Sequence, residues 1–305
     1  MKILLTGANG FLGYWLTRQL LQKNYTVIAT GKGENRLPFG SDPHFSYASM
    51  DFTDPFAVHD VFAEFRPDVV VHAGAMSKPD ECELQQWEAY TTNTEATITL
   101  LLNAEEQQSF FIFLSTDFVF DGKRGMYSED DIPNPVNFYG KTKKEAEEAV
   151  MEYEFDWAIA RTVLVYGKPP AGRNNLLTIV KEKLEKEEAY SVVDDQIRTP
   201  TYVEDLAAGI VSIIEKKAIG IYHLSGDEQL TPYEMACQAA DHLGLDKKLL
   251  KKVTAESFAE PARRPLKTGF ITRKAKNELG YCPVAFSEGL RRMFDGSETE
   301  CYTPF

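Results

Sequence analysis

Tyr139 and Lys143 stand four residues apart where the segment Phe138–Lys143 opens a strongly helical stretch over residues 141–153. Residues four apart lie on one face of a helix, so the phenol and the ammonium can reach the same bound molecule. A lysine ammonium beside a phenol favours the phenolate and lowers the pKa of the tyrosine toward working pH. The pair therefore predicts proton transfer at a bound carbonyl.

A threonine upstream adds a polar group for the same chemistry. Thr116 follows the apolar run Phe110–Ser115, which has the pattern of a buried strand. In open α/β sheets ligands bind at the carboxyl ends of strands, so a hydroxyl there could hydrogen-bond the carbonyl that Tyr139 protonates. The alternative is a hydroxyl that merely ends the strand in a turn. We predict Thr116, Tyr139 and Lys143 as the catalytic group.

Three glycines follow the first apolar run of the chain with the spacing GxxGxxG. The run is Lys2–Thr6, and directly after the glycines comes the helical pattern Phe11–Gln22. Glycine is needed where the backbone turns tightly and approaches a pyrophosphate, and the next helix directs its free N–H groups at the phosphates. An ordinary strand-to-helix turn is the alternative. We predict a dinucleotide site with contacts from Gly7, Asn9, Gly10, Phe11, Leu12 and Gly13.

Lys32 and Arg36 follow the second strand, predicted over Tyr25–Thr30, where NADH and NADPH are told apart. An acid at this strand end would hydrogen-bond the ribose 2′-hydroxyl and repel a 2′-phosphate. The chain instead has Gly31 and Lys32 there, with Glu34 displaced. Both basic residues could meet the 2′-phosphate, or both could be solvated loop charges. We predict NADPH, with NADH as the alternative.

Apolar runs of strand length alternate with helical patterns along much of the chain. This alternation is typical of βαβ units and predicts an α/β fold, a Rossmann-type doubly wound parallel sheet with helices on both faces. Pro169–Gly172 is the clearest break, and a more charged, helical composition follows, as at Ile179–Glu188. Further strands are predicted at 69–73, 157–165 and 219–224. We place the dinucleotide-binding domain at 1–168 with a return at about 199–224, and a smaller interleaved substrate lobe at 169–198 and 225–305.

Composition excludes several classes of function. The 305 residues carry 33 Lys+Arg against 46 Asp+Glu, a formal net charge of −13, which argues against generic binding to nucleic acid or anionic membranes. No run reaches the ~18 apolar residues of a transmembrane helix, and no signal-peptide pattern opens the chain. The 4 cysteines lack paired spacing and the 5 histidines lack ligand spacing, so we expect reduced thiols in a cytoplasm and no metal.

Five motifs together resemble the extended short-chain dehydrogenase/reductases. They are TGANGFLG at 6–13, STDFVFDG at 115–122, YGKTK at 139–143, RTVLVYG at 161–167 and RTPTYVEDLA at 198–207. The nearest likeness is to the dTDP-4-dehydrorhamnose reductases, which have STDYVFDG and then YGxTK. The resemblance implies hydride transfer to a 4-keto sugar nucleotide, with Thr116, Tyr139 and Lys143 as the triad and Lys143 also on the nicotinamide ribose.

The same resemblance implies further cofactor contacts. An acid and an aromatic residue after a strand resemble the family's adenine contact, the loop after another strand lies beside the cofactor, and a helix asparagine supports the active site. These residues are Asp51, Phe52, His72, Ala73, Gly74 and Asn93.

Two positions depart from the reductase pattern. Phe118 stands where the reductases usually have Tyr, and Leu164 where they have Trp, so the sugar is left open. A 4,6-dehydratase is disfavoured because Phe118, and no glutamate, follows Asp117. Two alternatives stay open. One is a 4-epimerase, which needs only the Tyr/Lys pair and a retained NAD. The other is a non-catalytic cofactor-binding subunit, like the regulatory subunit of methionine adenosyltransferase, which shares these motifs.

Substrate selection is expected in the second lobe, where a planar guanidinium could match the diphosphate of a nucleotide sugar. The arginine candidates are Arg161, Arg173, Arg198, Arg263 and Arg264. The pair before Pro265 resembles the family's RRP near its C-terminal substrate region and ranks above Arg173. We predict Asp117, Arg198, Arg263 and Arg264 as substrate contacts. The loop charges Lys78, Asp80 and Glu83 are expected to be solvated, and a homodimer is open as the assembly.

Overall fold

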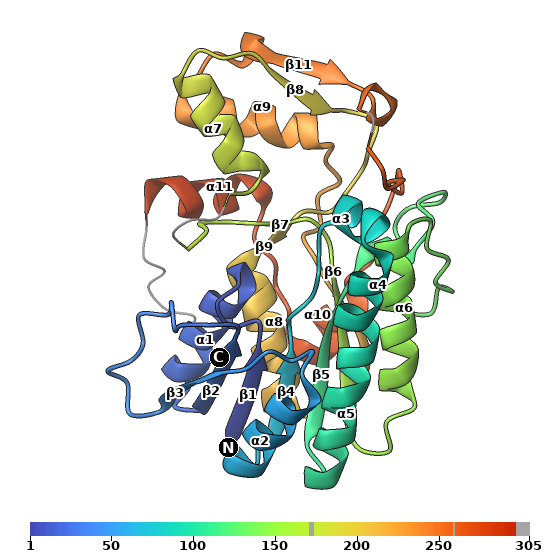
Figure 1. Ribbon diagram of the computed structural model, residues 1–305. Helices are drawn as coiled ribbons and strands as arrows, with labels where there is room; N and C mark the ends of the chain where they lie inside the picture. The colour runs from blue at the N-terminus through green and yellow to red at the C-terminus, as the bar shows by residue number, and fades with distance from the viewer. Residues whose placement is uncertain (171–173, 259, 297–305) are drawn as a thin grey trace.

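The computed structural model describes residues 1–170, 174–258 and 260–296, and among them a seven-stranded sheet forms the centre of the molecule (Figure 1). Its strand order is β10-β6-β5-β4-β1-β2-β3, and every pairing is parallel. The order reverses between β1 and β4, which is the switch point of a Rossmann-type sheet. The predicted α/β class is confirmed. The strands are β1 (Lys2–Thr6), β2 (Thr26–Gly31), β3 (Phe45–Ser49), β4 (Val69–His72), β5 (Phe110–Thr116), β6 (Trp157–Thr162) and β10 (Gly220–Leu224).

Helices cover both faces of this sheet, because alternate residues of each strand point to opposite sides. Ile3 and Leu5 of β1 belong to one apolar cluster, whereas Leu4 belongs to the cluster on the opposite face. The helices of the first cluster are α1 (Phe11–Gln22), α8 (Val203–Lys216) and α10 (Arg273–Leu279). Those of the second are α2 (Pro55–Phe65), α5 (Ala96–Gln107) and α6 (Phe138–Met151).

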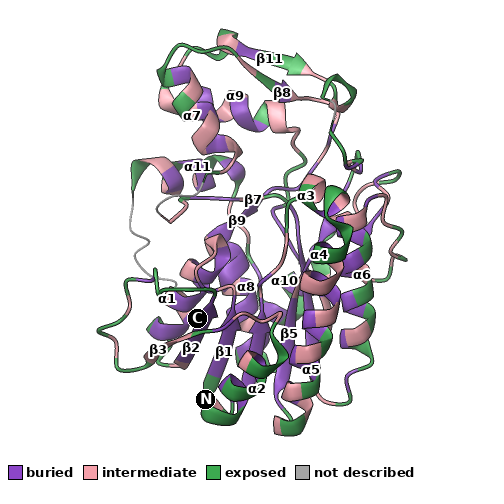
Figure 2. Ribbon diagram, in the orientation of Figure 1, coloured by how far each residue is buried: buried purple, intermediate pink, exposed green. Residues whose placement is uncertain are grey.

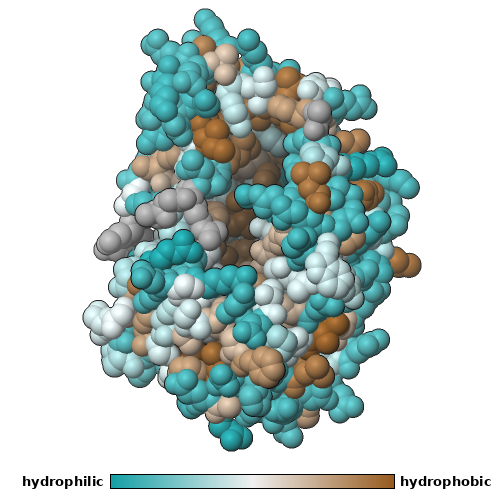
Figure 3. Space-filling model, viewed as in Figure 1, coloured by the Kyte–Doolittle hydropathy of each residue, from teal (hydrophilic) through white to brown (hydrophobic). Residues whose placement is uncertain are grey.

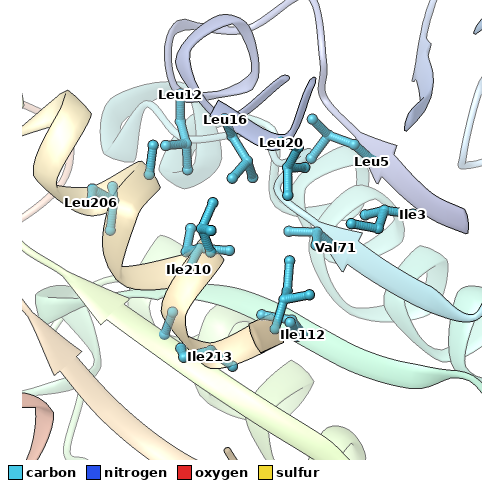
Figure 4. Packing of buried hydrophobic residues seen from close by; sticks show 14 of the residues in the cluster. Ile3, Leu5, Leu12, Leu16, Leu20, Val71, Ile112, Leu206, Ile210 and Ile213 are labelled. Carbon is cyan, nitrogen blue, oxygen red and sulfur yellow. The ribbon is translucent and has the colours of Figure 1, made fainter. Parts of the chain in front are cut away.

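The apolar stripe of α1 faces the sheet, and the helix has the predicted bounds. Leu16 and Leu20 are fully buried and Leu12 nearly so. Figure 4 shows the stripe packed against Leu206 and Ile210 of α8. Burying a leucine in this way stabilises the fold by about 1.5–3 kcal/mol. The stripe therefore anchors the helix whose N-terminus follows the glycine turn.

The run predicted as a single strand over 157–165 is divided. β6 stays in the sheet, while β7 (Val165–Tyr166) leaves it and pairs with β9 (Thr201–Tyr202). Leu164 between them has a φ of 32°, in the left-handed region that a leucine rarely adopts. This turn ends the sheet pairing and sends the chain toward the second lobe.

A smaller lobe stands above the carboxyl edge of the sheet (Figure 1). Val180 and Leu184 of its first helix pack on Ala236 and Ala240 of the second, and β8 pairs with β11 in parallel. Its elements are α7 (Leu176–Glu185), β8 (Tyr190–Val193), α9 (Pro232–Leu243), β11 (Leu250–Val253) and α11 (Phe286–Asp295). Helix α7 starts before the predicted 179 because Asn175 caps it.

The segment predicted for the lobe after residue 225 does not stay there. Ala275 and Leu279 of α10 are buried in the apolar cluster that α1 and α8 form on the sheet. The chain therefore alternates between the two units, as the interleaved arrangement predicts, and the domain boundaries remain a prediction.

A helical path leads from β4 to β5 along the second face of the sheet. It consists of α3 (Pro79–Leu84), α4 (Gln86–Tyr90), a π-helical turn (Thr91–Glu95) and α5. Figure 2 shows the central strands buried beneath these helices, whose outer faces carry the exposed residues. Within the described part of the chain, no helix combines the length and the apolar character needed to cross a lipid bilayer.

Candidate active site

The predicted catalytic residues come together at the carboxyl edge of β5. Thr116 is the last residue of β5, and Tyr139 and Lys143 lie on the first two turns of α6. Asn137 caps this helix by accepting a hydrogen bond from the Gly140 N–H at 2.8 Å. The cap starts the helix at residue 138, earlier than predicted, and so places the tyrosine in the first turn.

Gly140 allows α6 to approach the end of β5 closely. A Cβ at this position would stand 2.1 Å from the backbone oxygen of Phe118, in the 3₁₀ turn Asp117–Val119. A larger residue would therefore push the helix start away from Thr116. Phe118 also packs edge-on against the Tyr139 ring, with centroids 5.7 Å apart.

The Tyr139 phenol lies in a site that favours its neutral form. Burial raises its pKa, a hydrogen bond with Thr116 lowers it in part, and the Asp117 carboxylate raises it further. The lowering of this pKa that the sequence predicts does not occur with the protein groups alone, because burial raises the pKa instead. The phenol is therefore held as a proton donor.

Lys143 is 2% exposed, and in the described part of the chain its ammonium forms no ion pair with a carboxylate. Burial lowers the pKa of this ammonium to about 7, although Glu147 one turn further along α6 opposes the shift. Its Nζ lies 3.8 Å from the ring centroid of Phe113. No hydrogen-bond or ion-pair acceptor for it occurs among residues 1–170, 174–258 and 260–296. This ammonium is therefore available to a ligand.

Arg161 is not a phosphate ligand, which corrects its place among the candidates. Its side chain is 1% exposed, and its Nε and Nη2 donate to the two carboxylate oxygens of Glu147 at 2.9 and 2.6 Å. Its Nη1 faces His223 at 3.4 Å. A guanidinium committed to a bidentate pair in the core cannot reach a ligand.

The glycine turn has the geometry of a phosphate site. Gly7 has a φ of 69°, and a Cβ there would stand 2.8 Å from the Gly74 nitrogen, while one at Gly13 would stand 2.4 Å from the Ala8 oxygen. Gly10 begins α1 without any side chain capping the helix. The free N–H groups of the first turn suit the phosphates of a dinucleotide, so the residues present fit the predicted cofactor.

The loop after β2 is held by Asn9 and by Tyr47, a residue that the sequence does not single out. The Asn9 amide nitrogen donates to the Tyr47 hydroxyl at 2.9 Å, and its oxygen accepts from the Arg36 N–H at 3.1 Å. The Tyr47 hydroxyl in turn donates to the oxygens of Gly31 and Gly33. No motif marks Tyr47, which lies in a short strand. Asn9 thus ties the glycine turn to the predicted cofactor-selecting loop.

Two of the predicted cofactor contacts already form an ion pair with each other. Lys32 Nζ lies 2.9 Å from a carboxylate oxygen of Asp51, and the side chains are 65% and 39% exposed. A 2′-phosphate would compete with Asp51 for this ammonium. Their roles toward a cofactor stay predictions.

His72 lies beneath the predicted cofactor loop rather than in it. The Gly74 N–H donates to the Thr6 hydroxyl, which shares a hydrogen bond with His72 Nδ1 at 2.7 Å, and the other ring nitrogen lies 3.2 Å from the Thr97 hydroxyl. Burial, and then the Lys143 charge, lowers the pKa of His72 to about 3, so the ring is neutral. The imidazole therefore positions the loop through Thr6.

Phe52 and Asn93 brace the same loop from two sides. A Cβ on Gly74 would stand 2.5 Å from the Phe52 ring, so the aromatic ring packs closely on Gly74. Asn93, in the π-helical turn, accepts from the Met76 N–H at 2.8 Å and donates to Thr142 of α6 at 3.1 Å. The asparagine thus joins the loop after β4 to α6, and its predicted support of an active site stays a prediction.

The predicted substrate contacts meet different surroundings. Arg264 is bidentate to Asp80, with both distances 2.6 Å, so Asp80 is paired rather than solvated. Arg263 is exposed, and its backbone oxygen accepts from Asn137 at 2.7 Å, which places it beside the cap of α6. Arg198 is 4% exposed. Arg173 lies outside the described residues.

The catalytic edge of the sheet faces a hollow between the two lobes, and apolar residues form its floor (Figure 3). In the described part of the chain, no three His, Cys, Asp or Glu side chains come together as metal ligands.

Comparisons with known proteins show the family of the chain. The family model described as the RmlD substrate binding domain matches residues 1–299. The methionine adenosyltransferase 2 subunit beta of Bos taurus is 35% identical over 270 residues, covering 87% of this chain and 78% of the relative. The spore coat polysaccharide biosynthesis protein SpsK of Bacillus subtilis is 32% identical over 301 residues, covering 98% and 99%.

Solved structures are similar over the same length. The crystal structure of a dTDP-4-dehydrorhamnose reductase from Bacillus anthracis, in complex with NADP, has a TM-score of 0.85 and 29% identity. The match covers 97% of this chain and 99% of that one.

Proposed function

The chain belongs to the family described as the RmlD substrate binding domain, among the extended short-chain dehydrogenase/reductases, and on that premise we propose that it reduces the keto group of a 4-keto sugar nucleotide. When bound, the nicotinamide cofactor supplies the hydride that the carbonyl carbon receives. The observation that carries the proposal is the convergence of Thr116, Tyr139 and Lys143, all buried, at the carboxyl end of β5, on the same edge of the parallel sheet as the glycine turn after β1.

Each residue of the triad has one task in this proposal. Tyr139 gives its phenolic proton to the carbonyl oxygen as the carbon is reduced, which balances the charge of the added hydride. Thr116 directs its hydroxyl at the same oxygen and polarises the carbonyl. Lys143, whose ammonium has no ion-pair partner among the described residues, hydrogen-bonds the cofactor ribose, and its positive charge favours the phenolate that Tyr139 becomes.

The cofactor we propose is NADPH, with NADH as the alternative. Support comes from Lys32 and Arg36 after β2, in the absence of an acid there, and from the bacterial reductase whose structure was solved in complex with NADP. Asp51 already holds Lys32, so release from this pair accompanies binding of the 2′-phosphate. On the substrate side, Arg263 is exposed and its backbone oxygen accepts from Asn137, the cap of α6, and we propose Arg263 for the diphosphate.

Steady-state oxidation of NADPH tests the proposal. The purified protein is mixed with NADPH or NADH and a panel of 4-keto sugar nucleotides, and consumption of reduced cofactor is followed together with the sugar product. A reductase consumes one reduced cofactor per product, whereas an epimerase converts the sugar with none consumed. Conversion without consumption would overturn the proposal.

A second candidate is a non-catalytic cofactor-binding subunit. The identity to a subunit of methionine adenosyltransferase favours it. Under this candidate the protein binds NADPH in the glycine turn but turns over no ketone. Retained NADPH affinity, measured by calorimetry, together with no oxidation on the whole panel would favour the subunit.

A further inference from the structure

A segment of the C-terminal part crosses the catalytic edge of the sheet and is tied to it at several points. We call residues 262–271 the strap. The Ala262 N–H donates to Asp80 at 3.0 Å, the Lys267 N–H to the Gly122 oxygen at 3.0 Å, and the Phe270 N–H to the Thr199 hydroxyl at 3.1 Å. The strap therefore runs from α3 past the turn after β5 to the start of β9.

One side chain of the strap reaches the residue next to the catalytic threonine. The Thr268 hydroxyl, fully buried, donates to Oδ2 of Asp117, and the Arg198 Nε lies 3.6 Å from the same oxygen. Oδ1 of Asp117 accepts the hydroxyl of Thr116 at 3.1 Å. Each oxygen of this 2% exposed carboxylate thus has its own set of donors.

Arg198 is fixed as firmly as the carboxylate that it faces. Its Nη1 donates to the oxygens of Ile197 and Leu266, and its Nη2 donates to Gln196 and to the Pro265 oxygen. With Nε toward Asp117, all five N–H groups of the guanidinium face acceptors of the protein. Arg198 therefore has no donor left for a diphosphate in this arrangement, and it joins the strap to Asp117.

We infer that Thr268 and Arg198 are positioning residues that act on the catalytic Thr116 through the Asp117 carboxylate. Donors on Oδ2 withdraw charge from the carboxylate, and this weakens its hold on the hydroxyl proton of Thr116. The proton is then free to turn toward a ketone oxygen. The inference rests on the proposed reductase for its kinetic consequence and on the hydrogen bonds alone for its effect on Asp117.

The titration of Asp117 reports this arrangement directly. Burial raises the pKa of the carboxyl, and Arg198, Thr268 and Thr116 each oppose the rise. The charged and titratable groups that face the carboxylate are Arg198, from the connection between β8 and β9, and Tyr139, from α6. Loss of the strap hydroxyl should therefore raise the pKa of Asp117.

Two valine variants, at positions close together in the chain, test this inference. Thr268→Val removes the hydroxyl that meets Asp117. Thr272→Val removes the hydroxyl of another buried threonine, 4% exposed, which donates to Asp227 at 2.9 Å, away from the site. Thr268→Ser keeps the hydroxyl and is the rescue variant. Asp117 is followed by NMR of protein carrying ¹³C-labelled aspartate carboxyls, with the signal assigned by its loss in Asp117→Asn.

We expect Thr268→Val to raise the titration midpoint of Asp117 by about one pH unit or more, since a hydrogen bond to a charged group is worth that much. Thr268→Ser and Thr272→Val should leave the midpoint in place. On an accepted ketone, Thr268→Val should lower kcat with an unchanged KM for NADPH and move the acid limb of the pH profile upward.

A midpoint in Thr268→Val equal to that in Thr272→Val would overturn the inference. A kcat in Thr268→Val equal to that of the wild type, with the midpoint raised, would overturn its kinetic half. A raised midpoint in a protein that oxidises no NADPH would instead contradict the proposed reductase and uphold the effect of the strap on Asp117.

Discussion

Lys143 and Glu147 lie one turn apart on α6 and are equally buried, yet their charges meet opposite surroundings. Glu147 shares two hydrogen bonds with Arg161, at 2.9 and 2.6 Å. Lys143, in contrast, has an aromatic ring beneath its ammonium and no acceptor among the described residues. The same helix thus carries one buried charge that is paired and another that has no ion-pair partner among the described residues.

This difference separates a charge that stabilises the fold from a charge that is available to a ligand. A buried charge with a bidentate partner stays ionised and holds two elements together, here α6 and β6. A buried charge without a partner moves its pKa instead, and that of Lys143 falls to about 7. Burial alone therefore does not mark a functional residue, whereas burial without a partner at a ligand-facing edge does.

Removal of the Tyr139 hydroxyl, in the first turn of α6, should have the largest effect on activity. Tyr139→Phe keeps the ring packed on Phe118 and deletes the proposed proton donor, so kcat should fall by about 10²–10⁴-fold with unchanged NADPH affinity. Tyr153→Phe is the matched control, because its buried hydroxyl donates to the Ser109 oxygen at 2.8 Å, away from the site. Equal activity of the two folded variants would contradict the assignment.

At the ion pair of Arg161 with Glu147, removal of one partner should lower the free energy of unfolding rather than the catalytic rate. Arg161→Met leaves the Glu147 carboxylate buried and unpaired, and we expect the free energy of unfolding to fall by about 3–5 kcal/mol in urea denaturation. The double variant Glu147→Leu with Arg161→Met removes both charges and should recover most of this loss. If the single variant proved as stable as the double one, the pair would not be a structural charge.

The pH dependence of stability should expose the uncompleted charge of Lys143. Its folded-state pKa, about 7, lies below its ordinary value of 10.5, so between these values the unfolded chain binds more protons and wild-type stability rises with pH. Lys143→Met lacks this term. The variant should be more stable than the wild type by a few kcal/mol at pH 6, one pKa unit being about 1.4 kcal/mol, and the gap should close by about pH 10. A gap independent of pH would show that the ammonium is not strained by burial.

The ion pair of Lys32 with Asp51 lies at the surface, in contrast to the buried charges of α6. Changing it should have the smallest effect of the variants described. Lys32→Glu with Arg36→Glu should shrink the preference for NADPH over NADH through repulsion of the 2′-phosphate. The free energy of unfolding should change by less than about 1 kcal/mol, since exposed pairs contribute little. Lys23→Glu, which breaks another 2.9 Å surface pair with Glu215, is the control and should leave the cofactor ratio in place. An unchanged ratio in the first variant would assign Lys32 and Arg36 to solvent.

Much of the cofactor side follows from short stretches of sequence. Residues that are neighbours in the chain determine the bounds of α1, the glycine turn and the buried strand that ends at Thr116. Helix stripes, tight turns and strand runs are local patterns, so the sequence predicts them. The catalytic spacing of Tyr139 and Lys143 is local for the same reason, and the family motifs lie within such stretches.

The substrate side follows from contacts between distant parts of the chain. Arg161, Arg198 and Arg264 are the same residue type, yet the fold gives them different partners. Arg161 pairs with a buried carboxylate, and Arg198 donates to several acceptors of the protein. Arg264 pairs with Asp80, which lies 184 residues before it in the chain. Likewise, nothing local predicts that Thr268 meets Asp117 or that burial raises the pKa of Tyr139. The sequence by itself determined which elements form and which chemical groups the chain offers. Only the tertiary structure decided which charges are paired, because pairing and burial depend on which distant segments the sheet and the strap bring together.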